Sequence, residues 1–289
     1  MRTRLLKYMR SWCLGSATAL GFATGAAAGD RVASADFCAD QYVLAYADRG
    51  DIVAVSFEAG GPNSFHAVRA AGLPIISGSA EEILSLRPDV LVRSWRGSAG
   101  TDALFFRAGT RVIQPPWAMS PDDNFTNMVL IADEFGNGAA AQATVEDYRA
   151  RWAALKTAPK SPLKAAYLTP SGYTAGEGTF VDAIIRLAGF GTTADAIGLK
   201  GWGPLPLEAV VMNPPDLVIG SFFEAGIVHV SNWSGGRHGA YGRMIDDLPA
   251  IMVPSRFLSC SGAFFVDAAE HIRAEATKLG LYAGAEAAP

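Results

Sequence analysis

The chain has 289 residues, half of them hydrophobic, and a formal net charge of −4 at pH 7. That length is sufficient for one large domain or for two lobes of ordinary size. The acidic balance and the lack of a basic stripe argue against a nucleic-acid partner and against an anionic membrane surface.

The N-terminus has the three parts of a secretory signal peptide. Four basic residues and no acid precede Asp30, an apolar run covers residues 12–22, and Ala26-Ala27-Ala28 is a small-residue cleavage site. The run is too short and too rich in glycine and alanine for a convincing membrane span, and a permanent anchor is the alternative. We expect export to the periplasm and cleavage near Ala28, which takes the net charge from −4 to −8.

Short strands alternate with short helices between residues 31 and 113, which is the pattern of a mostly parallel α/β layer. Helices are predicted over 121–135 and 139–156, and the second has one apolar stripe and a length of about 27 Å. Strands and helices alternate again from Lys164. After the signal peptide over residues 1–28, we predict an N-terminal α/β lobe, a connecting helix and a C-terminal α/β lobe, over residues 29–137, 138–158 and 159–289.

Two segments of the second half lack periodicity, and we expect loops at 169–179 and 222–242. A loop of the second length is usually functional or mobile. The first contains Gly176-Glu177-Gly178, which lacks the third glycine of a dinucleotide-binding loop. We interpret it as a small-residue turn that lets a ligand approach the backbone.

One stretch of the chain occurs twice. Residues 80–94 and 207–221 match at a constant offset, each with a glutamate in the first turn of a short helix, a Pro-Asp break and a buried strand. Helix–break–strand units of this kind recur in α/β proteins. One interpretation is therefore that the two stretches are similar folding units without a further relation. The other is two related lobes that each present one glutamate, Glu81 and Glu208, at an equivalent place.

Two cysteines, Cys38 and Cys260, remain after residue 28. An even count in an exported protein favours a disulfide, although its geometry is open at this point. Free thiols, or soft ligands for a bound metal chelate, are the alternatives.

The sequence has no Gly-x-Ser-x-Gly elbow, His-Glu-x-x-His, Walker loop or Cys-x-x-Cys pair. Its four histidines show no metal-ligand spacing on a helix, so we predict neither catalytic residues nor a protein-bound metal. A carboxylate pair for glycoside hydrolysis has no fixed sequence spacing and is therefore not tested.

Aromatic residues and arginines instead follow the strands, where ligands bind in open α/β sheets. Aromatic faces suit a large flat ligand, and arginine suits an acidic one. The candidates for ligand binding are Phe37, Trp95, Arg96, Tyr173, Trp202, Trp233 and Arg237.

Residues 31–40, residues 78–89 and the run from Tyr173 resemble the periplasmic solute-binding proteins of ABC importers for ferric siderophores, haem and vitamin B12. The resemblance covers the chain after residue 28. It implies two α/β lobes joined by one long helix, with the ligand in the cleft between them. It also implies a monomer, not an enzyme, whose Glu81 and Glu208 dock against arginines of an ABC permease dimer in the inner membrane.

The vitamin B12-binding members of that family have cleft aromatics at positions that match Trp95, Tyr173 and Trp202. A further cleft tryptophan of theirs has no counterpart among Ile76–Ser79, which counts against vitamin B12 itself. The resemblance also places both cysteines in loops at the border of the cleft, where a disulfide would tie the lobes together.

We therefore expect a periplasmic binding protein that captures a ferric siderophore, haem or cobalamin-type metal chelate and has no intrinsic cofactor. A secreted α/β hydrolase or metal-dependent enzyme is one alternative. A metal-chelate chaperone or sensor without a permease is the other.

Overall fold

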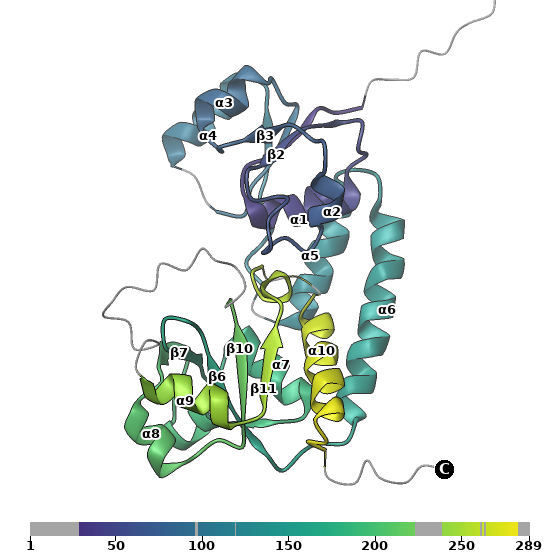
Figure 1. Ribbon diagram of the computed structural model, residues 1–289. Helices are drawn as coiled ribbons and strands as arrows, with labels where there is room; N and C mark the ends of the chain where they lie inside the picture. The colour runs from purple at the N-terminus through teal and green to yellow at the C-terminus, as the bar shows by residue number, and fades with distance from the viewer. Residues whose placement is uncertain are drawn as a thin grey trace, which may run out of the picture.

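The computed structural model describes residues 29–95, 98–118, 120–222, 239–260, 262 and 264–282. It has two α/β lobes stacked end to end beside one long helix (Figure 1). The proposed signal peptide and the predicted site residues Arg96, Trp233 and Arg237 lie outside the described residues. Within the described ranges, no helix combines the length and the apolar character that crossing a bilayer requires.

The elements of the N-terminal lobe are, in chain order, β1 (Val32–Ser34), α1 (Phe37–Tyr46), β2 (Ile52–Ser56), α2 (Ala67–Ala70), β3 (Ile75–Ile76), α3 (Ala80–Ser85), β4 (Val90–Val92), α4 (Ala99–Arg107) and β5 (Arg111–Ile113). The strands form one parallel sheet in the order β3-β2-β1-β4-β5. Helices cover both faces, so the central strands are continuous apolar runs, as a parallel sheet requires.

The elements of the C-terminal lobe are β6 (Lys164–Leu168), β7 (Tyr173–Ala175), α7 (Phe180–Ala188), β8 (Gly191–Thr192), β9 (Trp202–Pro204), α8 (Leu207–Met212), β10 (Leu217–Ser221), α9 (Gly239–Asp247), β11 (Ala250–Val253) and α10 (Phe264–Lys278), with 3-10 turns at Thr193–Ile197 and Ser255–Phe257. A parallel sheet has the order β11-β10-β6-β8, and β7 pairs with β9 in a separate antiparallel ribbon. The ribbon corrects our prediction of a loop over 169–179. Its two strands are separated in sequence by α7 and a 3-10 turn, so their pairing has no local signal.

Helix α5 (Pro121–Asp133) leads from the N-terminal lobe to the long helix α6 (Gly138–Thr157), which runs beside both lobes in Figure 1. At its start, Asn137 Nδ2 donates to the carbonyl oxygen of Tyr46 at 2.6 Å. Farther along, Arg151 forms an ion pair of 2.7 Å with Asp267 of α10. The helix is therefore fastened to α1 in one lobe and to α10 in the other. The predicted fold class, two Rossmann-like α/β lobes joined by a long helix, is confirmed.

The two sheets have corresponding strand orders. Strands β2, β1, β4 and β5 of the first sheet correspond to β8, β6, β10 and β11 of the second. The repeated Pro-Asp break also makes the same contact twice: Asp89 accepts a hydrogen bond from the Arg31 backbone N–H, and Asp216 accepts one from that of Lys164, both at 2.8 Å. Each aspartate holds the start of its lobe's first strand. This shared role favours two related lobes over two merely similar units.

Candidate functional site

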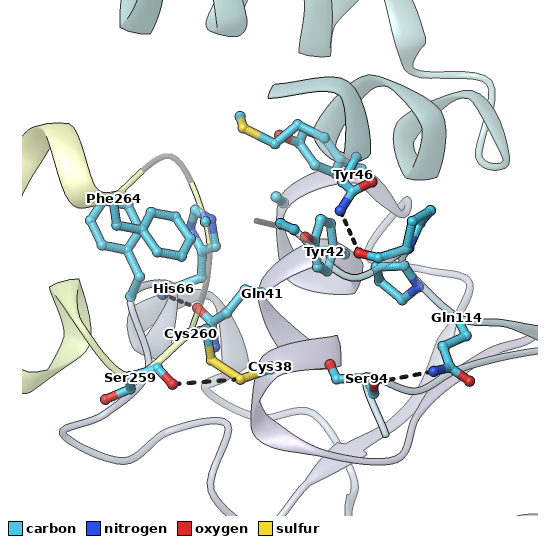
Figure 2. Close-up of a pocket in the computed structure, with 18 of the residues that line it drawn as sticks. Cys38, Gln41, Tyr42, Tyr46, His66, Ser94, Gln114, Ser259, Cys260 and Phe264 are labelled. Atoms are coloured by element: carbon cyan, nitrogen blue, oxygen red, sulfur yellow. Dashed lines mark hydrogen bonds between the residues drawn. A yellow bond between two sulfur atoms is a disulfide. The ribbon is translucent and has the colours of Figure 1, made fainter. Parts of the chain in front are cut away.

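A cavity of about 320 Å³ lies where the two lobes meet, and we call it the interlobe cavity (Figure 2). Its wall comes from α1, from the segments 65–69, 94–95 and 114–118, from α5 and α6, and from Ser259, Cys260, Gly262 and Phe264 of the C-terminal lobe. Sites between domains are common places for small-molecule binding.

One face of α1 forms a large part of this wall. The opposite face is also apolar, since Val43 and Leu44 are buried in the core of the lobe. The sequence therefore does not reveal which face meets the cavity. The lining residues recur at helical spacing and are Cys38, Gln41, Tyr42, Ala45 and Tyr46.

Asp36 fixes the start of α1 and the loop beside it. One carboxylate oxygen accepts hydrogen bonds from the backbone N–H groups of Cys38 and Ala39, at 3.1 and 2.9 Å, as an N-cap. The other oxygen accepts a bond of 2.7 Å from the backbone N–H of Ser94. One side chain thus positions both the helix and the loop that carries Trp95.

Gln41 is a buried polar residue that orders the neighbouring loop. Its Nε2 donates to the carbonyl oxygen of Phe37 at 2.7 Å and to Ser64 Oγ at 3.1 Å, and its Oε1 accepts from the His66 backbone N–H at 3.1 Å. These bonds hold Phe65 and His66 at the cavity wall. Sequence reasoning did not find this role, because nothing in the spacing of Gln41 relates it to a loop some twenty residues later.

Two contacts join the lobes at the cavity. Cys38 of α1 and Cys260 of the segment before α10 form a disulfide, with Cα atoms 5.4 Å apart. Phe65 stacks on Phe264, with ring centroids 4.1 Å apart, and His66 lies edge-on to the Phe264 ring at 5.8 Å. The lobes are therefore held together here both covalently and by aromatic packing.

A histidine and an aspartate near the cavity have shifted pKa values. Burial, and secondarily the charge of Arg69, lowers the pKa of His66 to about 4, so its imidazole is neutral at pH 7. Burial raises the pKa of Asp40 to about 6, even though Asp40 accepts hydrogen bonds from the backbone N–H and the hydroxyl of Ser56 at 3.0 and 2.6 Å. Both groups belong to the N-terminal lobe.

The ligand-binding residues predicted from sequence fall into two groups. Trp95 lines the interlobe cavity and is 61% exposed, while Tyr173 and Trp202 lie on the β7–β9 ribbon, 47% and 51% exposed, and are not part of the wall. Phe37 begins α1, is half-buried and is also not part of the wall. Trp117, 75% exposed and lining the cavity, was missed. It follows β5 as Trp95 follows β4, so the same rule should have found it.

The glycine turn of the C-terminal lobe serves the fold. A side-chain carbon on Gly176 would lie 2.2 Å from the carbonyl oxygen of Leu199. The backbone N–H groups of Gly176 and Glu177 donate to the carbonyl oxygens of Gly201 and Leu199, at 2.9 and 3.0 Å. The close approach at Gly176 is thus made by the chain's own backbone, and a ligand beside this turn stays a prediction.

Glu81 and Glu208 occupy the second position of two six-residue helices, α3 and α8. Both side chains are exposed. Figure 1 shows α3 in one lobe and α8 in the other, both on the side of the molecule away from α6. The molecule thus presents one such carboxylate from each lobe.

The fold and the cavity define a class: a two-lobed α/β binding protein with its site between the lobes. The sequence model of a family described as periplasmic binding protein matches residues 38–224, more than half of the chain. The chain belongs to the periplasmic binding protein family, and the resemblance seen in the sequence is confirmed. Within the described part of the chain, no group of three or more His, Cys, Asp or Glu side chains is arranged to hold a metal ion.

Several known proteins are similar to this chain. A cobalamin-binding protein of Halobacterium salinarum is 30% identical over 196 residues, which are 66% of this chain and 53% of that protein. The chain thus spans about half the length of the curated relatives that it matches.

Among solved structures, one is the periplasmic haem-binding protein BhuT in complex with two haems. It has a TM-score of 0.67 at 19% sequence identity, and the matched region covers 86% of this chain and 98% of the BhuT chain. The haem-binding protein HutB of Vibrio cholerae has a TM-score of 0.65 at 22% identity, with coverages of 85% and 98%. The vitamin B12-binding protein BtuF of Vibrio cholerae has a TM-score of 0.60 at 20% identity, with coverages of 87% and 98%. At these identities, the likenesses show the fold.

Proposed function

We propose that this chain is the solute-binding component of an ABC importer and that it captures a metal chelate in the periplasm. The chelate is a ferric siderophore, haem or a cobalamin-type corrinoid. The observation that carries the proposal is the interlobe cavity, which is lined by aromatic side chains from both lobes in a member of the periplasmic binding protein family. A concave, mostly apolar and preformed site is typical of small-molecule binding.

Binding is non-covalent and uses aromatic surface from both lobes. Trp95 and Trp117 supply exposed rings on the N-terminal lobe, and Tyr173 and Trp202 supply them on the C-terminal lobe. A large flat ligand between the lobes removes these rings from water, which is favourable in proportion to the apolar area buried. Further candidates are Phe37 and, outside the described residues, Arg96, Trp233 and Arg237, the arginines as partners for acidic groups.

Delivery uses Glu81 and Glu208. An exposed carboxylate on each lobe suits simultaneous contact with arginines on the two subunits of an inner-membrane permease dimer.

The same proposal includes export by a signal peptide cleaved near Ala28 and a monomeric protein. It places the N-terminal lobe at residues 29–137, the connecting helix at 138–158 and the C-terminal lobe at 159–289. It assigns the chain no catalytic role and no intrinsic cofactor.

Titration of intrinsic fluorescence with haemin, cyanocobalamin and a ferric siderophore tests the proposal. We expect saturable binding of one of them at micromolar or tighter Kd. Trp95→Ala and Trp202→Ala should each weaken it roughly tenfold, because a well-packed aromatic contact contributes about 1–2 kcal/mol.

Trp152→Phe is the matched control, because Trp152 packs against Phe125 and Phe265 away from the cavity wall. This variant should keep the wild-type Kd. A protein that binds none of the three chelates at micromolar concentration contradicts the proposal.

A further inference from the structure

The interlobe cavity is smaller than the chelates proposed above. Its volume of about 320 Å³ is roughly twice that of an apolar cavity that accommodates one benzene ring. Two fused aromatic rings fit in such a space. A larger ligand extends from it to the exposed rings of the cleft, so the cavity receives one part of the ligand.

The cavity offers aromatic surface from two directions. Phe264, stacked with Phe65, belongs to one part of the wall, and Tyr42 and Tyr46 of α1 belong to another. Figure 2 shows Phe264 and His66 on one side of the space and Tyr42 and Tyr46 on the other. A flat group placed between them has aromatic neighbours on more than one side.

The amide donors of the wall are already used within the protein. Asn127 Nδ2 donates to the carbonyl oxygen of Pro116 at 2.7 Å, and Gln114 Nε2 donates to that of Ser94 at 3.5 Å. Gln41 is occupied by the bonds described above. Each of these side chains therefore has a donor that is not free for a ligand.

Several polar groups of the wall remain available, among them the Ser94 hydroxyl. The hydroxyls of Tyr42 and Tyr46 and the ring nitrogens of His66 have no hydrogen-bond partner among the residues that the structure describes. Burial raises the pKa of Tyr42 to about 12 and also raises the pKa of Tyr46, so both phenols keep their protons at pH 7. These groups donate or accept hydrogen bonds without carrying charge.

The described part of the wall has one cationic side chain. Arg69 is its charged side chain, and its guanidinium donates to the carbonyl oxygens of Leu44 and Ala45, at 3.0 and 3.2 Å. A carboxylate that entered the cavity would lose its hydration and meet mostly uncharged donors beside the partly occupied Arg69, which is less favourable for a charged group than for a neutral one.

We infer that the interlobe cavity binds an uncharged bicyclic aromatic or heteroaromatic group, whose polar edge bonds to the hydroxyls of Tyr42 and Tyr46 on one side of the space, with His66 available on the other. The group is an arm of the chelate whose larger part lies against Trp95 and Trp117. Only this assignment to the chelate rests on the proposed function; the selectivity of the cavity follows from its own wall.

Two probes with the same rings and different charge test the inference. Calorimetric titration at pH 7 should give saturable binding of 2-naphthol and at least tenfold weaker binding of 2-naphthoate. Ala45→Phe places a phenyl group into the cavity from α1 and should weaken 2-naphthol binding at least tenfold. Ala153→Phe, at an exposed position of α6 outside the wall, is the matched control and should bind like the wild type.

A second variant covers the case in which Ala45→Phe fails to fold. Tyr42→Phe with Tyr46→Phe removes only hydroxyl groups, so it should weaken 2-naphthol several-fold and leave the binding of naphthalene unchanged. Equal affinity for 2-naphthol and 2-naphthoate, no detectable 2-naphthol binding, or wild-type binding by Ala45→Phe overturns the inference. A protein that binds 2-naphthol but none of the three chelates retains this inference and loses the proposed function.

Discussion

The two lobes share their scaffold and differ in the segments that follow their first strands. Each has the same central strand order, an aspartate that holds the first strand, and an exposed glutamate on a six-residue helix. In the N-terminal lobe, Asp36 starts α1 directly after β1. In the C-terminal lobe, β7 intervenes between β6 and α7 and pairs with β9.

The contacts that the two lobes share hold each lobe together, and the segments that differ between the lobes form the candidate binding surfaces. The duplicated contacts hold each lobe, whereas the wall of the interlobe cavity comes mainly from α1 and the loops of the N-terminal lobe. The C-terminal lobe contributes the segment before α10 to that wall and carries its exposed aromatic rings on the β7–β9 ribbon. The lobes are therefore equivalent as folding units and unequal as binding surfaces.

The largest effect is expected where the lobes are most alike. Glu81→Ala with Glu208→Ala should abolish uptake of the proposed chelate in cells that depend on this protein, because it removes the carboxylate of each lobe from the proposed permease contact. If the lobes are equivalent, the two single variants lose uptake by similar factors. Uptake of labelled chelate is the measurement, and the Kd for the chelate should not change.

Glu146→Ala, at an exposed glutamate of α6, is the control for this experiment and should transport normally. Normal uptake by the double variant would remove the docking role and favour a chelate chaperone or sensor that works without a permease.

Removing the disulfide measures how much the covalent link between the lobes contributes to stability. Cys38→Ser with Cys260→Ser should lower the free energy of unfolding by about 2–4 kcal/mol, because the bond closes a loop across a sequence separation of 222. Urea unfolding followed by tryptophan fluorescence and circular dichroism measures it. Reducing agent should shift the wild type to the variant's midpoint and leave the variant unchanged; identical midpoints for oxidised wild type and variant would contradict this.

The pH dependence of stability reports on the N-terminal lobe. His66 has a pKa of about 4 in the folded protein against an ordinary 6.5, so its contribution to stability falls as the pH drops from 6.5 to 4. Asp40 has a pKa of about 6 against an ordinary 3.8, so its contribution falls as the pH rises from 3.8 to 6. The two contributions, each up to about 3 kcal/mol, largely offset one another in the wild type.

Single substitutions should reveal the two opposite dependences of the free energy of unfolding on pH. Asp40→Asn is expected to lose stability on acidification from pH 6.5 to 4, and His66→Gln is expected to gain it. Urea unfolding at several pH values between 4 and 7 is the measurement. Two variants with the same sign of slope would refute the assignment.

The smallest effect comes from the matched aspartates. Asp89→Ala and Asp216→Ala each remove one hydrogen bond of 2.8 Å to the backbone of the lobe's first strand. Each should lower the free energy of unfolding by about 1 kcal/mol. Because the contacts are the same, the two values should agree within error in urea unfolding; a loss confined to one lobe would break the equivalence.

Local patterns predicted the scaffold well. The apolar runs predict strands over 111–113 and 164–168, which are the bounds of β5 and β6, and α6 extends the predicted helix by one residue at each end. The helix–break–strand repeat located Glu81 and Glu208 on equivalent helices. These features depend on periodicity and on proline and glycine positions, which are properties of short windows.

The site depends on contacts between distant residues, which short windows do not contain. Phe65 meets Phe264 only when the lobes are assembled. The sequence predicts a helix from the turn at 36–40 to about Ala47, and it contains Tyr42 and Tyr46. Both faces of this helix, α1, are apolar, so the face that meets the cavity was not distinguishable. The position of Trp117 directly after β5 could have identified it as a candidate ligand-binding residue, and this was overlooked.

The Cys38–Cys260 bond also has a consequence for biosynthesis. Cys38 emerges from the ribosome early, and its partner follows only after both sheets and the connecting helices have been made. After residue 28 the other cysteine is Cys260, so Cys38 has no partner in that part of the chain until Cys260 has been made. A molecule that contains this bond has therefore been synthesised past its second sheet, and its two lobes have come together. The presence of the disulfide thus shows that the two lobes have assembled.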